Sequence, residues 1–163
     1  MLDDYENIKN YKLIIISAHN EYWTRKGRRN FDKFIDEGGD PLILSGNTMW
    51  KQVRYEDDKV ICFNQYYNDS LFPDSLRTSN YGLIYLKYPI ESSIGLNFTK
   101  GGYGIQQDNG WNGYKIVGES ILLKNTELAK GDILSVPSEE CDGADLIFEN
   151  DKVTLDTNFI NFY

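Results

Sequence analysis

Two short apolar runs with a helix-like segment between them constrain the fold of this chain more than any other feature. The run Lys12–Ser17, KLIIIS, does not alternate with polar residues, which is typical of a strand buried on both faces of a parallel sheet. The run Pro41–Leu44, PLIL, has the same character. Because parallel strands need a crossover, usually a helix, the pattern predicts a βαβ unit as the core of residues 12–54.

The segment between the two runs has the signals of a helix over Thr24–Glu37. Thr24 is a residue type that caps helix N-termini, Phe31 and Phe34 lie on one helical face, and Gly38-Gly39 follows as a stop. The basic residues of the first turns are Arg25, Lys26, Arg28 and Arg29. Because cations oppose the helix dipole at this end, we expect them to form a solvated face or to meet an acidic neighbour.

Downstream of this unit the sequence changes character. Ser45–Gln52 predicts a turn followed by a short helix, whereas residues 55–163 contain short apolar runs broken by Gly, Pro, Asn and Asp. Such runs predict strands and loops with few helices. The glycine–aromatic segments 101–104 and 109–113 are expected to be turns. No linker divides the chain, so we treat residues 1–163 as a single domain.

The fold class follows from the position of the βαβ unit. A doubly wound sheet has more than two parallel strands, and this chain starts almost directly at one βαβ unit. We therefore expect an α/β fold, an incomplete doubly wound parallel sheet with a β-rich C-terminal portion. The chain would be the C-terminal part of a larger α/β domain, completed by an upstream segment, by a partner chain or in a homo-oligomer.

Composition restricts the class of partner. The net charge of −8 argues against nucleic acid, which requires a basic face, and against anionic membrane surfaces. No signal peptide is evident, and no apolar run approaches the ~18 residues that a membrane span requires, so we expect a cytoplasmic protein. Cys62 and Cys141 lack metal-type spacing, and we expect two free thiols.

Three polar residues follow the predicted strands. His19, the only histidine, and Glu21 come after the first strand, and Asn47 comes after the second. Ligands of open α/β sheets bind outside the carboxyl ends of the strands, so we expect these side chains to lie at one edge. A strand, a turn and a helix also resemble a nucleophile elbow. Asparagine is no nucleophile, so general acid–base or metal-assisted chemistry is favoured.

Structural roles remain open for the same residues. His19 can cap the helix or hydrogen-bond within a polar loop, and Glu21 can be an acid favourable to the helix dipole. Downstream, Glu139–Asp145 lacks the ligand spacing of an EF-hand, and Asp142-Gly143 is predicted to form a tight turn. Cys141 has no second histidine to activate it.

Read as a whole, the pattern resembles a known family. The segments are AHNEYWT, a helix, then EGGDPLILSGNTMWKQVR, followed by YPIESSIGLNF, GGY and ECDGAD. Together they resemble the C-terminal domain of the large (beta) subunit of N,N-dimethylformamidase and its relatives, over nearly the whole chain. The family pattern is close to GHDEYW, a helix, GGN, a strand and GGNTxxWxVR.

The resemblance implies a fold similar to class I glutamine amidotransferases and a hydrolase that cleaves C–N bonds of small amides. It also implies a mononuclear iron(III) held by two tyrosines and one glutamate. The glutamate maps onto Glu21. The motif histidine maps onto His19 as an acid–base group, and the motif asparagine onto Asn47 as a substrate or oxyanion partner. A hard trivalent ion prefers such oxygen ligands.

The chain departs from the family pattern at several positions. The residue before His19 is Ala18 in place of glycine, and Asn20 replaces the motif aspartate. The family's two tyrosines lie upstream of the motif, where this chain has only Tyr5 and Tyr11, and neither matches. The iron ligand set is therefore incomplete within these residues.

Three hypotheses follow. The first is the C-terminal part of a dimethylformamidase-like amide hydrolase that needs an upstream segment or partner chain. The second is a noncatalytic ligand-binding or assembly module of the same fold, in which the loop around Trp111 holds a ligand. The third is a metal-free hydrolase with Glu21 as base.

Overall fold

The computed structural model describes residues 2–103, 114–134, 140–144, 146–149 and 152–155. Its first half contains η1 (Tyr5–Asn7), β1 (Leu13–Ser17), β2 (Tyr22–Thr24), α1 (Arg25–Asp36), β3 (Asp40–Leu44), β4 (Lys51–Glu56), β5 (Lys59–Ile61), η2 (Tyr66–Asn68), η3 (Asp74–Leu76) and β6 (Ser79–Asn80). The second half contains η4 (Ile84–Leu86), α2 (Glu91–Ile94), β7 (Asn97–Tyr103), β8 (Tyr114–Lys115), η5 (Ile121–Leu123), β9 (Ile133–Leu134), β10 (Glu140–Gly143), β11 (Leu146–Glu149) and β12 (Lys152–Leu155). The η elements are single 3₁₀ turns. Within this described part the chain is a mixed α/β protein made mostly of strands.

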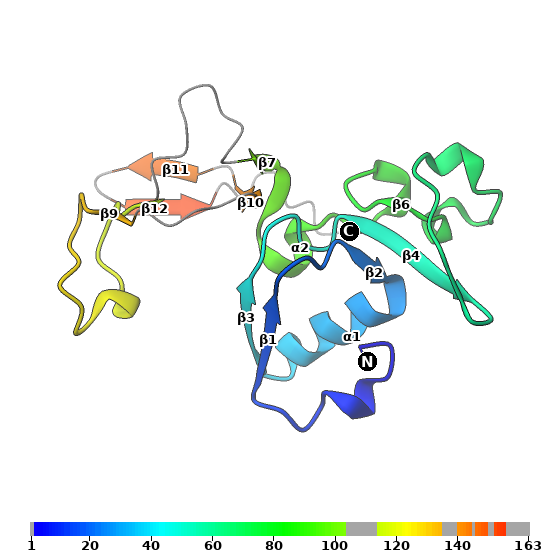
Figure 1. The fold of residues 1–163 in the computed structure, drawn as a ribbon, viewed down its shortest axis with the longest axis horizontal. Helices are drawn as coiled ribbons and strands as arrows, with labels where there is room; N and C mark the ends of the chain where they lie inside the picture. Colours follow the sequence, from blue (N-terminus) through cyan, green and yellow to red (C-terminus); the bar gives the residue numbers. More distant parts are fainter. Residues whose placement is uncertain (1, 104–113, 135–139, 145, 150–151, 156–163) are drawn as a thin grey trace.

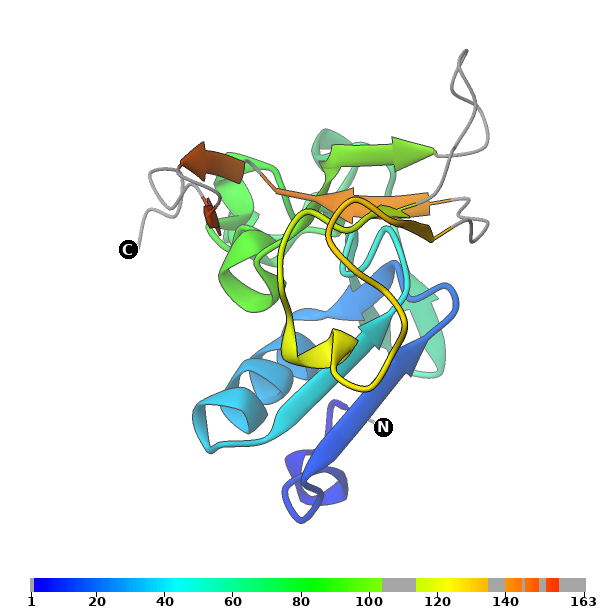
Figure 2. The same ribbon diagram turned by 90° about the vertical axis from the view of Figure 1, so that its left-hand side faces the viewer.

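The predicted βαβ unit is present. β1 and β3 are parallel, with Leu13 opposite Asp40 and Ser17 opposite Leu44, and α1 connects them through Gly38-Gly39 (Figures 1 and 2). The helix begins where the sequence predicts, because Thr24 Oγ1 accepts a hydrogen bond from the Gly27 N–H at 2.9 Å.

Only one face of the β1–β3 pair is covered in the described chain. Ile14, Ile16 and Ile43 pack into the hydrophobic core beside α1. On the other face four large side chains remain exposed: Leu13, Ile15, Leu42 and Leu44. The prediction that these strands are buried on both faces is therefore wrong, since these side chains remain exposed and no second layer from the described residues covers them.

Among the described residues the strands form five small sheets. The β1–β3 pair gains no further parallel strand there, so the coarse α/β class is confirmed, whereas the doubly wound architecture stays a prediction. No helix in this part of the chain has the length and apolar character needed to cross a bilayer.

The short helix expected within Ser45–Gln52 is wrong. After the turn the chain enters β4, which runs parallel to β2 with Tyr22 opposite Lys51. The Lys51 N–H donates to the Glu21 carbonyl at 2.7 Å, so pairing with a distant strand replaces local helix formation. β4 also pairs antiparallel with β5 and β6.

The second half is strand-rich, as predicted. β7 pairs with β10, β8 with β9 and β11 with β12, all antiparallel. The turn expected at Gly101 is wrong, because this residue lies inside β7. A Cβ there would lie 1.8 Å from the Cys141 carbonyl oxygen, so the glycine permits close strand contact. The segment 109–113 with Trp111 lies outside the described residues.

The basic face of α1 is partly buried rather than solvated. Arg28 is fully buried, with its guanidinium 3.7 Å from the Tyr88 ring centre and 4.6 Å from that of Tyr81. It donates to the Tyr88 carbonyl at 2.8 Å, to the Pro89 carbonyl, and to Ser93 Oγ at 2.8 Å. Carbonyl dipoles and aromatic faces thus compensate the buried cation, and the negative charge of Asp32 contributes as the acidic neighbour that the sequence left open.

Arg28→Ala should lower the free energy of unfolding by about 3 kcal/mol, because it opens a cavity and leaves buried carbonyls without donors. The exposed Arg29 on the same helix is the matched control, and Arg29→Ala should stay within about 0.5 kcal/mol of wild type. Urea unfolding followed by circular dichroism measures both. Equal stability of the two variants would contradict the proposed role of Arg28.

Candidate functional site

The chain turns sharply at the carboxyl end of β1. Ala18 adopts a left-handed conformation with φ of 59°, which ends the strand and starts the loop that carries His19. The Asn20 carbonyl then accepts hydrogen bonds from Trp23 Nε1 at 2.6 Å and from the Met49 N–H at 3.3 Å. These bonds join the loop 18–21 to the buried Trp23 and to the turn that follows β3.

The turn 45–49 contacts a segment from the far end of the chain. The Asn47 and Thr48 N–H groups donate to the two carboxylate oxygens of Asp142 at 2.9 and 3.1 Å. Gly46 lies so close to β10 that a Cβ would be 2.2 Å from the Glu140 carbonyl oxygen. The prediction of a tight turn at Asp142-Gly143 is wrong, because both residues belong to β10. Gly143 pairs with Asn97 of β7, and Asp142 lies at the register shift between Cys141 and Gly143.

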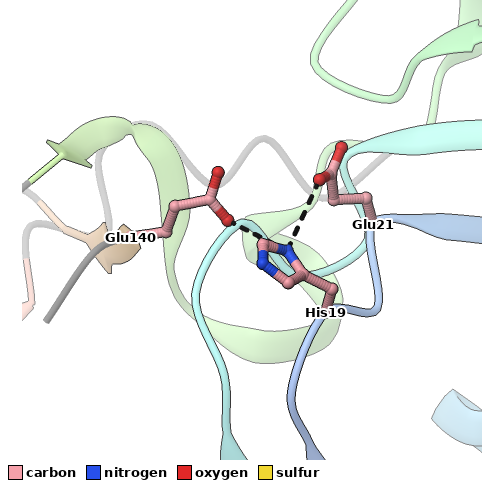
Figure 3. A group of neighbouring side chains, drawn as sticks. All are labelled: His19, Glu21 and Glu140. Atoms are coloured by element: carbon pink, nitrogen blue, oxygen red, sulfur yellow. Dashed lines mark ion pairs between the residues drawn. The ribbon is translucent and has the colours of Figure 1, made fainter.

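The contact between the turn 45–49 and β10 brings a second carboxylate, that of Glu140, close to His19. His19 Nδ1 lies 3.7 Å from Glu21 Oε1 and 3.4 Å from Glu140 Oε2, and Figure 3 shows the two carboxylates on either side of the imidazole. The histidine side chain is 69% exposed, whereas those of Glu21 and Glu140 are 21% and 13% exposed. We call His19, Glu21 and Glu140 the acidic cluster. It lies beyond the carboxyl ends of β1 and β3, where β10 approaches (Figures 1 and 2).

The acidic cluster lies in a region of negative charge. The charge of Glu21, together with partial burial, raises the pKa of the Tyr22 phenol. Burial raises the pKa of Asp142 although the amides of Thr48 and Asn47 act in the opposite direction, and the charge of Glu140 adds to the rise. Carboxylates gathered in this way favour a bound cation.

The structure brings two of the three predicted site residues together as expected, His19 and Glu21. Asn47 is buried, and its Oδ1 has no hydrogen-bond partner among the described residues. Its backbone joins the site through Asp142. Glu140 was missed by the sequence interpretation, although it starts the ECDGAD segment that carries the family resemblance.

The donor set fits part of an iron site. One imidazole nitrogen and two carboxylate oxygens lie within 4.8 Å of one another, and such nitrogen and oxygen ligands suit iron, manganese and zinc. The two upstream tyrosines do not contribute. Tyr5 donates its phenol hydrogen bond to Glu37 at the end of α1, and Tyr11 precedes β1, so both lie at the amino side of the strands.

The fold and the acidic cluster define a mixed α/β protein with a carboxylate–imidazole site that can hold a metal cation or transfer protons. Comparison with known families then identifies the group. Residues 2–157 match the family described as N,N-dimethylformamidase beta subunit-like, C-terminal, so the chain belongs to that family. The family description indicates a hydrolase-like role. No curated protein and no solved structure gave a match.

The conformation of Ala18 is one that glycine, the residue of the pattern that this sequence resembles, adopts more readily. A left-handed conformation costs a residue with a Cβ roughly 1–2 kcal/mol, whereas glycine adopts it without strain. After allowance for the greater freedom of glycine in the unfolded chain, Ala18→Gly should raise the free energy of unfolding by about 1 kcal/mol. Urea unfolding measures this change.

Ala129 is the matched control, because it is exposed and is not among the residues with positive φ. Ala129→Gly should lower the free energy of unfolding by about 0.5–1 kcal/mol. If Ala18→Gly destabilises the protein as Ala129→Gly does, the strain at Ala18 is absent.

Proposed function

We propose that this chain is the C-terminal part of a hydrolase that cleaves the C–N bond of small amides. The observation that carries the proposal is the convergence of His19, Glu21 and Glu140 within 4.8 Å at the carboxyl ends of the parallel strands. These residues come from segments far apart in the sequence, and a solvated acidic surface would not require two of them to be partly buried.

Glu21 is the proposed ligand of a mononuclear iron(III), with further ligands from a segment outside these residues. When bound, the iron supplies a Lewis acid that polarises the amide carbonyl and acidifies a water molecule. Glu140 supplies the second carboxylate at the site. Its oxygen faces His19 Nδ1, which favours a proton on Nδ1 and leaves Nε2 to accept or donate a proton.

His19 and Asn47 have the two remaining roles, which are proton transfer and stabilisation of the developing negative charge. His19 Nε2 carries a proton to the leaving amine, which would otherwise depart as an unstable amide anion. The Asn47 side-chain amide donates to the oxygen that becomes negative as the carbonyl is attacked. The buried position of Asn47 supports this role, because a donor held in a fixed position stabilises charge without reorganising.

We further infer that the β1–β3 pair is the edge of a larger sheet of the glutamine amidotransferase type. Parallel sheets are normally covered on both faces, and the uncovered face is apolar. An upstream segment or a partner chain, including a second copy, would cover it. The same face supports a second candidate function, a noncatalytic assembly module. Free Cys62 and Cys141 suit a reducing compartment such as the cytoplasm.

The metal assignment is tested in the natural protein, with any upstream segment or partner in place. Glu21→Gln should reduce iron content to background, and hydrolysis of N,N-dimethylformamide should be lost. His19→Gln should retain iron but lower kcat by about 10²–10⁴-fold, the usual contribution of a general acid or base. Metal analysis and steady-state kinetics measure both.

The exposed Glu127 is the control, because Glu127→Gln removes a carboxylate that is not part of the acidic cluster. It should change neither iron content nor kcat. Full iron content and full hydrolysis in Glu21→Gln would refute the role of Glu21. A wild-type protein without iron but with activity lost in Glu21→Gln would favour the metal-free hydrolase.

Thiol labelling of the natural protein tests whether another layer covers the apolar face of β1 and β3. Ile15 and Val60 are matched strand residues, 59% and 56% exposed in this chain. Ile15→Cys should resist maleimide until the protein is denatured, because another layer covers it, whereas Val60→Cys should react at once. Peptide mass spectrometry reports each thiol separately. Equal reactivity of the two thiols would show that the face stays open.

A further inference from the structure

The Asp142 carboxylate makes a contact that the proposed chemistry does not use. Its two oxygens accept from two consecutive backbone amides, those of Asn47 and Thr48, at 2.9 and 3.1 Å. Charge-assisted hydrogen bonds of this two-pronged kind are among the stronger ones in proteins. Both amides belong to the turn that carries Asn47.

The Asp142 contact links the strand that carries Glu140 to the loop that carries His19 and Glu21. Glu140 lies two residues from Asp142 on β10, about 7 Å along a strand. Gly46, beside Asn47, packs against the Glu140 carbonyl. On its other side the same turn is joined to the His19–Glu21 loop through the Met49 N–H and the Asn20 carbonyl at 3.3 Å.

We infer that Asp142 is a positioning residue, whose carboxylate holds β10 on the turn 46–48 and thereby sets the distance between Glu140 and the His19–Glu21 pair. The inference rests on the proposed function for its chemical consequence. Asp142 itself touches neither iron nor substrate. Its effect reaches the site through the backbone of Asn47 and through the strand that carries Glu140.

The side chain must be an aspartate for geometric reasons. Asparagine has one acceptor oxygen and an NH₂ group that cannot accept, so it satisfies one of the two amides and places a donor against the other. Asp142→Asn keeps the size of the side chain and removes the paired contact. Asp132 is the matched control, because its carboxylate accepts the Ala129 N–H at 2.8 Å in an exposed turn.

The first measurement is independent of iron and activity. In the wild-type protein the Asn47 and Thr48 amides should exchange with deuterium at least tenfold more slowly than exposed loop amides. Asp142→Asn should remove this protection and shift the His19 ring resonances at fixed pH, which are easily assigned because the chain has one histidine. Asp132→Asn should leave both signals unchanged.

The second measurement concerns the site. Asp142→Asn should weaken iron binding about 10–100-fold, the usual effect of removing a residue that orients a ligand, and should lower kcat with little change in KM. Asp132→Asn should behave as wild type. Lost amide protection with unchanged His19 resonances, iron affinity and kcat would overturn the positioning role.

Two other outcomes are informative. If Asp142→Asn does not fold, the wild-type exchange decides, because fast exchange at Asn47 and Thr48 would overturn the contact itself. If the wild-type protein binds no iron and hydrolyses no amide, the proposed function fails. The amide exchange and the His19 resonances then still test whether Asp142 positions Glu140.

Discussion

The candidate site depends on one set of backbone hydrogen bonds, those that join the turn after β3 to two other segments. On one side the Met49 and Lys51 N–H groups donate to the Asn20 and Glu21 carbonyls, at 3.3 and 2.7 Å. On the other side the Asn47 and Thr48 N–H groups meet Asp142. Because turn amides must find acceptors when they are buried, these contacts hold the loop 18–21, the turn 45–49 and strand β10 beside one another.

That arrangement holds two carboxylates close together beside one imidazole. Two partly buried carboxylates close to one another repel unless a cation or a proton lies between them, and His19 lies between them. The energy that holds the carboxylates in place comes from packing and backbone hydrogen bonding elsewhere, including the core around Trp23, Phe31 and Met49.

Sequence reasoning succeeded where interactions are local and failed where they are not. The helix, its Thr24 cap and the parallel β1–β3 pair follow from periodicity and capping, which act over a few residues. The short helix expected within Ser45–Gln52 is absent, and β4 begins at Lys51 instead, because its start depends on pairing with β2. Arg28 was expected in solvent, because its compensating groups, the carbonyls at Tyr88 and Pro89, lie some sixty residues away. Glu140 was missed for the same reason.

The sequence by itself determined the βαβ unit and the position of His19 and Glu21 together after a strand end. These depend on short-range spacing, which can be counted along the chain. Only the tertiary structure decided that Glu140 joins them, that Asp142 binds the turn of Asn47, and that one face of β1 and β3 is exposed in the part of the chain that the structure describes. Those facts arise from contacts between segments separated by many residues, and no local pattern specifies which strand will arrive at a given edge.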